Sequence, residues 1–538
     1  MKPGNITYSV FLFWGLLAML VIHSGFVDQK PIQKIIKQKV QQLRTTHALD
    51  RQFPIIYPNK ITEVYHQNNY HQIWNNPLKI RDFTNYLKES YSEGLNPADY
   101  HLIEIQQYLK RKNSNARASL DILLTDAFLR YAIHLSSGKI DTSLLKNRWV
   151  DSTAIDPVIY LNEIQKKTVS EVISEFAPKE TAYHDLKKAL AKYRYLDTRG
   201  GWQKIPYGSS IHPGDQDNRI PLITKRLIIT GDLIDNNNVI SSIYDQELRN
   251  SVIHYQKRNG LNPDGIIGRL TLESMNIPVT NRINQIRVNL ERWRWLPESL
   301  GSYYLFINIA DFKLYIRKDG KIISQHKIII GRYYRKTPVL TSHIAYLLFN
   351  PDWIVPPTVL KKDLLPLIRK NPAYLQREHF IVMDTNRTVL KTDTINWNNQ
   401  SAMDYLYLQR PGIMNPLGRV EFIFPSQYKI FMHDTPSQYL FQKNRRMFSS
   451  GCIRVSNALE LAEYLLNDPY WTIQKMQEII KTGKTTKVII RNKPALYIVY
   501  FTSWVDKNGT IEFRKDIYHR DAGVLSALND TNAITLVH

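Results

Sequence analysis

The pattern of apolar residues changes sharply near residue 300. Before it, apolar residues recur every three or four positions, as in residues 120–135, which is the spacing of a helix with one buried face. After it, residues 304–309 and 313–317 alternate between apolar and polar, and KDGK at 318–321 is typical of a hairpin turn. The chain is therefore expected to be α+β, with helical parts first and a β-rich part after them.

The same periodicity predicts individual elements. Residues 28–235 are expected to form a mostly helical scaffold, and 281–302 a linker helix. Helices are predicted at 81–91, 120–135, 183–193, 282–293 and 459–466, and further strands at 321–330, 344–349, 428–432, 488–490 and 496–501. A polar segment at about 356–410 alternates poorly and is expected to interrupt the sheet. Residues 505–538 are left as a C-terminal extension.

Composition restricts the partners. With 538 residues, of which 43% are hydrophobic, the chain can bury several cores, and its net charge of +23 suits polyanionic partners. Nucleic acid is the least favoured of these, because no compact Lys/Arg run with interleaved aromatics is present. No cysteines stand at zinc-site spacing, and a single cysteine allows no internal disulfide. No metal site is predicted.

The N-terminus has the pattern of an export signal. Lys2 precedes an uncharged apolar run at residues 8–22, which is short for crossing roughly 30 Å of hydrocarbon. We expect residues 1–27 to be a signal sequence or a membrane anchor, with cleavage left open. This predicts a periplasmic or envelope-exposed protein.

The only cysteine, Cys452, follows a histidine, His433, by nineteen positions. A thiol becomes a strong nucleophile when an imidazole takes its proton, and the same imidazole can return the proton to a leaving amine. Gly451 permits a tight turn, and the amides of Gly451 and Cys452 are candidate donors to an oxyanion. The alternative is a lone buried cysteine and a histidine that only decorates a turn. The residues alone therefore predict a cysteine acyltransferase or hydrolase.

The surrounding motifs favour the first interpretation. HDTP at 433–436, followed by SSGCIRV at 449–455, resembles the signature of L,D-transpeptidases, which cross-link bacterial peptidoglycan. The resemblance implies that Cys452 is the nucleophile, that His433 is the general base and acid, and that Arg454 gives electrostatic support. Ser450 stands where many members carry a histidine. Substrate contacts are expected from Trp353, Asn415, Gly418, Ser449 and Ser450, while the group that orients His433 stays open and includes a backbone carbonyl.

Two further stretches resemble parts of large, multidomain L,D-transpeptidases. LTDAFLRYAIHLSSGKI at 124–140 is similar to their helical scaffold, and residues 256–261 with 264–268 are similar to a peptidoglycan-binding module, placed here at 236–280. The resemblance implies a β-sandwich catalytic domain at 303–504, with the segment 356–410 as a lid over the active site.

The reaction that the resemblance implies needs no cofactor. Cys452 would attack a tetrapeptide stem after its third residue and release D-alanine, and the side-chain amine of an acceptor stem would then form a 3-3 cross-link. Carbapenems would form a lasting adduct on the thiol. Two other classes stay open, a cysteine peptidase or carboxypeptidase acting on stem peptides and a non-catalytic wall-binding scaffold, as does an acceptor amine on a protein.

Overall fold

The structure is a computed structural model that describes residues 29–141, 156–235 and 241–530. The predicted signal or anchor at 1–27 lies outside this range. Among the described residues, no helix is both long and apolar enough to cross a membrane. The chain divides into two compact units, one of residues up to 76 with 103–126 and one of residues 77–102 with 127 onward. Each unit is described by itself.

The first unit is helical and is organised around a buried carboxylate. Asp121 accepts hydrogen bonds from the Tyr65 hydroxyl at 2.6 Å and from the backbone amides of Ile73 and Trp74 at 3.1 and 2.7 Å. The loop after α2 is thereby tied to α5 without leaving a buried polar group unpaired. The elements are α1 (Gln29–Thr46), β1 (Ala48–Leu49), β2 (Phe53–Pro54), α2 (Pro58–Gln67), α4 (Leu102–Leu109) and the start of α5 (Ser114–Ser137).

The second unit begins with helices packed around α12 (Val279–Arg294). This helix was expected as a linker, yet it packs on α8, α18 and β17 and buries the charged side chains of Glu291, Arg292 and Arg294. The Arg294 and Glu291 side chains form an ion pair at 3.0 Å. α12 is therefore a core element of this unit. The other helices here are α3 (Pro77–Glu89), the end of α5, α6 (Val158–Lys166), α7 (Val169–Ser174) and α8 (Thr181–Thr198).

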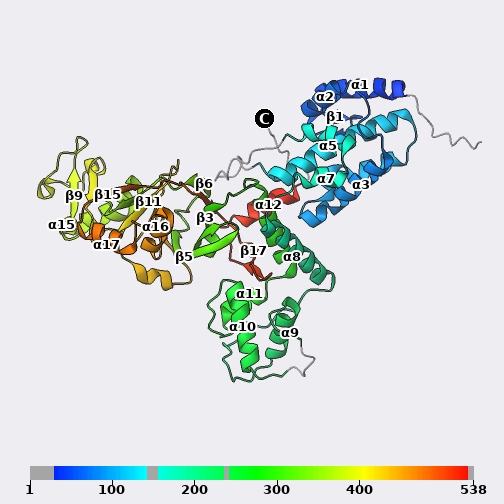
Figure 1. Cartoon of the computed structure of the whole chain (residues 1–538). Coiled ribbons are helices and arrows are strands. Elements are labelled where there is room, and N and C mark those ends of the chain that lie inside the picture. Colours follow the sequence, from blue (N-terminus) through cyan, green and yellow to red (C-terminus); the bar gives the residue numbers. More distant parts are fainter. Residues whose placement is uncertain (1–28, 142–155, 236–240, 531–538) are drawn as a thin grey trace, which may run out of the picture. The chain divides into compact units, whose positions relative to one another are not determined.

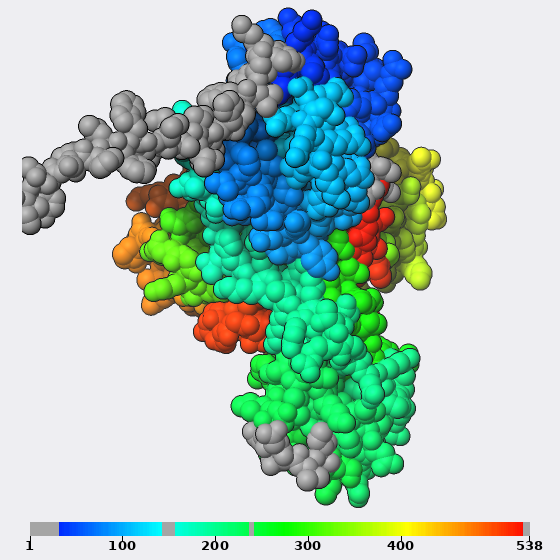
Figure 2. All heavy atoms as spheres, turned by 90° about the vertical axis from the view of Figure 1, so that its right-hand side faces the viewer, coloured from blue at the N-terminus to red at the C-terminus, as the bar shows by residue number. Residues whose placement is uncertain are grey.

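A small helical module follows and forms a compact green lobe in Figure 2. It consists of α9 (Ile220–Thr230), α10 (Gln246–Arg258) and α11 (Arg269–Met275) around one hydrophobic cluster. That cluster includes Ile205 and the apolar face of α9, so the module's core begins upstream of residue 236. Arg258 pairs with buried Asp232, and its backbone carbonyl accepts from Arg514 at 3.1 Å.

The two-residue periodicity predicted a β-rich part, and this prediction is confirmed (Figure 1). Its main sheet is a single eleven-stranded sheet, whereas the resemblance had implied a β-sandwich. Its strand order is β15-β7-β11-β12-β14-β5-β4-β3-β16-β6, with β13 beside β5. The long strand β5 pairs with β4 along its first half and with β14 near its end. The strands are β3 (Tyr303–Asn308), β4 (Lys313–Lys318), β5 (Lys321–Gly331), β6 (Leu340–His343), β7 (Tyr346–Phe349), β11 (Val420–Ile423), β12 (Met432–His433), β13 (Met447–Ser449), β14 (Ile453–Val455), β15 (Thr486–Ile489) and β16 (Ala495–Val499).

Two local predictions at this sheet had different outcomes. The KDGK hairpin is confirmed, because Asp319 and Gly320 both have positive φ and join β4 to β5. The strand predicted at 428–432 is wrong, because only Met432 and His433 are in a ladder. Lys429 instead adopts φ of 50°, and its amide bonds the Ser426 carbonyl in a turn. Apolar content alone suggested the longer strand, but the local turn bonds take these backbone groups.

An inserted segment between β8 (Trp353–Ile354) and β11 has a hydrophobic cluster of its own. The cluster includes Leu364, Ile368, Val382, Trp397 and Tyr407. The segment contains α13 (Pro357–Val359), a π-helical turn (Leu360–Leu364), α14 (Leu365–Lys370), α15 (Ala373–Arg377), β9 (Phe380–Met383) and β10 (Leu406–Gln409), and β8, β10 and β9 form a separate small sheet. We call residues 357–409 the insert. The helices α16 (Ala458–Leu466) and α17 (Ile473–Lys481) follow the main sheet's β14.

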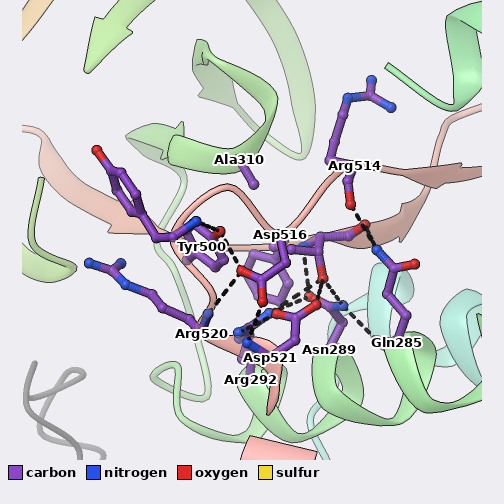
Figure 3. Close-up of polar contacts among 12 residues, drawn as sticks. Gln285, Asn289, Arg292, Ala310, Tyr500, Arg514, Asp516, Arg520 and Asp521 are labelled. Carbon is purple, nitrogen blue, oxygen red and sulfur yellow. Dashed lines mark hydrogen bonds and ion pairs between the residues drawn. The ribbon is translucent and has the colours of Figure 1, made fainter. Parts of the chain in front are cut away.

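The C-terminal segment fastens α12 to the sheet. It contains β17 (Ser503–Val505), β18 (Ile511–Phe513) and α18 (Asp521–Asn529). Asn289 of α12 exchanges two hydrogen bonds with Thr502 at 2.8 and 2.9 Å. Arg292 of α12 pairs with Asp521 at 2.7 Å, and Figure 3 shows these two side chains next to each other. Asp516 accepts from the Tyr500 hydroxyl at 2.7 Å. Residues 505–530, predicted only as part of a C-terminal extension, therefore belong to the core of this unit.

This network predicts a large stability cost for removing one charge. Asp521→Ala should lower the unfolding free energy of the second unit by about 3 kcal/mol, because it removes the carboxylate that pairs with the buried Arg292 guanidinium. Urea unfolding followed by tryptophan fluorescence would measure the change. Lys507→Ala, at an exposed turn of the same segment, is the control and should change stability by less than about 0.5 kcal/mol. Equal stability of the two variants would contradict the proposed anchoring.

Candidate functional site

Strand pairing brings the predicted cysteine and histidine to one face of the sheet. β12 runs parallel to β14, with His433 opposite Arg454, and the Ile453 amide bonds the Phe431 carbonyl at 2.9 Å. Side chains alternate along a strand and paired residues point to the same side. Cys452 and Arg454 therefore share a face, and His433 lies on it too. The neighbours on the other face, Ile453 and Val455, are buried in the core.

The imidazole of His433 is held in one tautomer. Its side chain is 4% exposed, and Nδ1 lies 2.6 Å from the Asp434 carbonyl oxygen. Because a carbonyl can only accept, Nδ1 carries the proton and Nε2 is the unprotonated nitrogen of the neutral ring. Burial, and next the positive charge of Arg454, lower the pKa of His433 to about 3. A backbone hydrogen bond to Leu417 raises the pKa of this ring, as does the one to Asp434. The carbonyl was one of the alternatives for the orienting group, and with this lowered pKa the ring is neutral at pH 7.

The turn before Cys452 is built on its own backbone and one hydroxyl. Ser449 Oγ donates to the Cys452 carbonyl at 2.5 Å and accepts from the Gly451 amide at 3.1 Å. Gly451 has φ of +123°, a conformation that favours glycine. The Gly451 amide is thus engaged within the turn. Among the described residues, no hydrogen bond occupies the Cys452 amide, so this amide is the better placed of the two predicted oxyanion donors.

The thiol is protonated in the resting site. Burial raises the pKa of Cys452, while a backbone hydrogen bond from Phe431 lowers it. The neighbouring charges act in opposite directions, because Glu421 raises this pKa and Arg454 lowers it. Arg454 itself is largely buried, and its Nε has no hydrogen-bond partner among the described residues. Its charge is therefore available to a thiolate or to a bound anion.

Glu421 is a member of the site that the sequence analysis did not identify. It lies on β11 directly opposite His433 and is 6% exposed, and its carboxyl group accepts no hydrogen bond from any described residue. Burial raises its pKa to about 7. Glu421, His433 and Arg454 therefore form one row across three strands. A signal was present in the sequence, since VEFIF places an acid inside an otherwise apolar strand.

The loop after β5 braces the turn from outside the motifs. Thr337 Oγ1 donates to the Gly451 carbonyl at 2.8 Å, and the Arg332 amide donates to the Ser449 carbonyl at 3.0 Å. Tyr518, from the C-terminal segment, donates to the Gly331 carbonyl at 2.5 Å. Since the Gly451 carbonyl and the Cys452 amide belong to one peptide plane, these contacts also orient that amide. No short motif marks them, because they join segments more than a hundred residues apart.

The remaining predicted residues lie in different surroundings. Trp353 packs on Phe380 of the insert, with ring centroids 6.0 Å apart. Asn415 is buried, and its side-chain amide donates to three backbone carbonyls. The shortest of these hydrogen bonds, 2.9 Å long, goes to the Pro351 carbonyl oxygen. Gly418 has φ of +67°, and a Cβ there would lie 2.6 Å from Asp434. These three residues have clear structural roles. Ser450 faces Arg335, which donates to its hydroxyl at 2.6 Å.

Two pockets are each lined by a predicted substrate-contact residue, Gly418 in one and Asn415 in the other, and neither is lined by Cys452 or His433. The larger, of about 730 Å³, is lined by Gly418, Asp434, Thr435 and the start of α16. Asp434, the residue after His433, contributes to the lining of this pocket. A second pocket of about 650 Å³ lies between the insert and the loop 409–415, where Asn415 contributes to its lining.

Comparison with known proteins agrees with the motifs. Residues 302–490 match the L,D-transpeptidase catalytic domain, 216–275 a "Putative peptidoglycan binding domain", and 59–190 a scaffold domain. The chain is 32% identical over 259 residues to a "Putative L,D-transpeptidase" of Haemophilus influenzae. That match covers 47% of this chain and 52% of the relative, so the chain spans about half the relative's length. The predicted resemblance is confirmed.

A solved structure is also similar in part. The crystal structure of an L,D-transpeptidase from Xylanimonas cellulosilytica aligns with 55% of this chain and 99% of that chain, at 14% identity and a TM-score of 0.19. A score this low does not establish a common fold.

The charges around the thiol predict a specific pH dependence. Alkylation of Cys452 by iodoacetamide should accelerate through the neutral and alkaline range, because the thiol is protonated at pH 7. Glu421→Gln should react a fewfold faster than wild type above about pH 7, where Glu421 is ionised and repels the thiolate, and equally below it. Glu478→Gln, on exposed α17, is the matched control. A rate independent of pH from 6 to 8, or no effect of Glu421→Gln above pH 7, would contradict this assignment.

Proposed function

From the premise that the chain combines an L,D-transpeptidase catalytic domain with a peptidoglycan-binding domain, we propose that it is a cysteine-dependent enzyme that cross-links peptidoglycan stem peptides. The donor is a tetrapeptide stem, whose bond after the third residue is cleaved with release of D-alanine. The acceptor is the side-chain amine of a second stem, and the product is a 3-3 cross-link.

One observation carries this proposal. Within the matched range, the sheet places a lone thiol, a neutral imidazole of defined tautomer and a cation on one face. These three groups are what an acyl transfer through a thioester requires. The geometry that fixes Nδ1 on a backbone carbonyl leaves Nε2 as the base. It also argues against a role for His433 as a simple turn residue.

Each half-reaction uses the same groups. Nε2 of His433 takes the Cys452 proton as Sγ attacks the scissile carbonyl, and the Cys452 amide donates to the oxygen that becomes negative. Collapse of the resulting tetrahedral intermediate breaks the peptide bond, and His433 returns the proton to the leaving D-alanine amine. The acceptor amine then attacks the thioester, loses a proton to His433, and releases the thiolate, which regains that proton. Arg454 lowers the pKa of the thiol during this cycle.

The proposed setting is the cell envelope. The +23 net charge suits the free carboxylates of stem peptides, and the α9–α11 module supplies the wall-binding part. The export signal at residues 1–27 belongs to this proposal. So does the insert as a lid, since Asp363 of the insert contacts Arg335 beside Ser450.

Muropeptide products test the chemistry. Full-length protein incubated with tetrapeptide muropeptides should produce dimers, detected by mass spectrometry, and Cys452→Ala should produce none. His433→Gln should lower the rate by on the order of a hundredfold or more, because the proton acceptor is lost. His66→Gln, at an exposed position of α2, is the control and should match wild type. Monomeric tripeptide without dimers would identify a carboxypeptidase, and dimers from Cys452→Ala would refute the role of the thiol.

A covalent probe tests the acyl-enzyme independently of an acceptor. A carbapenem should add one molecule per chain in intact-protein mass spectrometry, because ring opening on Sγ forms a thioester that is released slowly. The adduct should be absent in Cys452→Ala and should form more slowly in His433→Gln, where the thiol keeps its proton. A label on the alanine variant would place the reactive group elsewhere in the chain.

A further inference from the structure

Arg335 is a cation that contacts one residue of the SSGCIRV motif, Ser450, and one residue of the insert, Asp363. It lies in the loop after β5, and its amide bonds the Arg332 carbonyl at 2.9 Å. Its Nη1 donates both to Ser450 Oγ at 2.6 Å and to Asp363 Oδ2 at 2.5 Å. Ser450 precedes Cys452 by two residues, so the backbone of the residue that Arg335 contacts is at most about 7 Å from the backbone of the proposed nucleophile.

The loop that carries Arg335 is rigid where it meets the site. Thr337 Oγ1 accepts from the Gly331 amide at 2.9 Å and donates to the Gly451 carbonyl. Tyr518 closes the other side of the same loop, since it accepts from the Thr337 amide at 3.2 Å. Arg335 is therefore fixed relative to the Cys452 turn, and such preorganisation favours recognition of one defined group.

The two side chains of the Arg335–Asp363 ion pair differ in their exposure to solvent. The Arg335 side chain is 9% exposed, whereas the Asp363 side chain is 39% exposed. Asp363 lies on the π-helical turn of the insert, and such turns are frequent at functional sites. An exposed carboxylate on a buried arginine is exchangeable for a carboxylate from solution, because its own rehydration costs little. Asp363 is thus chemically equivalent to a ligand that carries a carboxylate.

If the proposed function is correct, the donor peptide carries a carboxylate of this kind at its C-terminus. The D-alanine that leaves carries the only α-carboxylate one residue beyond the scissile carbonyl, roughly 3.5 Å of chain away. Arginine is the side chain that best binds a carboxylate through paired hydrogen bonds. We propose that Arg335 recognises the terminal carboxylate of the donor peptide and so sets specificity for a free C-terminus. Asp363 occupies Arg335 in the free enzyme and is displaced when the donor binds.

The alternative for the same contacts is a simple latch that holds the insert in place. The two roles predict opposite effects for the two charges. If Arg335 binds the donor, removing Arg335 weakens binding and removing Asp363 strengthens it. If the pair is a latch, removing either residue has the same consequence, and the donor's C-terminus does not matter.

The experiment compares two donors on the full-length protein, a tetrapeptide ending in D-alanine and the same peptide ending in D-alanine amide. Arg335→Gln should raise KM for the acid donor about tenfold or more, with little change for the amide. Asp363→Asn should lower KM for the acid donor a fewfold. Arg335→Lys should restore part of the acid preference. Arg377→Gln, which removes another ion pair of the insert, is the control.

A second measurement needs no turnover. Protection of Cys452 from iodoacetamide should be stronger with the acid peptide than with the amide in wild type, and equal for the two in Arg335→Gln. If the wild-type protein turns over neither donor peptide, the proposed function is refuted. The protection of Cys452 from iodoacetamide then still tests whether Arg335 binds the carboxylate. An acid-to-amide ratio unchanged in Arg335→Gln, or parallel losses in Arg335→Gln and Asp363→Asn, overturns the inference. Thermal unfolding of each variant confirms that it is folded.

Discussion

The site depends on a two-residue parallel pairing between β12 and β14. Only Met432 with Ile453 and His433 with Arg454 are in register, yet this ladder sets which side chains share a face. A slip by one residue would send His433 to the core side and bring Asp434 forward. So short a ladder does not hold its own register, and the surrounding structure must supply the constraint. β11 flanks β12 and β5 flanks β14, so both strands are central.

The contacts that brace the nucleophile turn come from distant parts of the chain. Thr337 holds the Gly451 carbonyl, Tyr518 holds the loop that carries Thr337, and Asp521 pairs with Arg292 of α12. Tyr518 and Asp521 are joined through Asp516, because the Tyr518 amide donates to the Tyr500 hydroxyl and both that hydroxyl and the Asp521 amide donate to Asp516. A route of hydrogen bonds and ion pairs thus runs from α12 to the turn at Cys452. This explains why the C-terminal segment, which lies beyond the range of the catalytic-domain match at 302–490, is packed into the same unit.

The electrostatics of the site favour a neutral resting state. Burial disfavours charge on both proposed reactants, since it raises the pKa of the Cys452 thiol and lowers that of the His433 imidazole. A neutral pair avoids the cost of burying a thiolate and an imidazolium without substrate. Glu421 and Arg454 then bias the thiol in opposite directions. Proton transfer would accompany attack on the carbonyl, and the thiol would be protected from unselective reactions beforehand.

The sequence by itself determined the α+β class and the helical and two-residue periodicities, because these signals are local. It also identified His433 and Cys452 as candidate catalytic residues. Periodicity depends on neighbouring side chains, and HDTP and SSGCIRV are short continuous motifs. Local signals also misled where turn bonds competed with apolar content, as at 428–432, and where α12 looked like a linker. Only the tertiary structure decided that Glu421 faces His433, that Arg335 reaches Ser450 and Asp363, and that Tyr518 braces the turn. Each of these contacts requires strands or loops far apart in the chain to be in a particular register, and no single segment encodes that register.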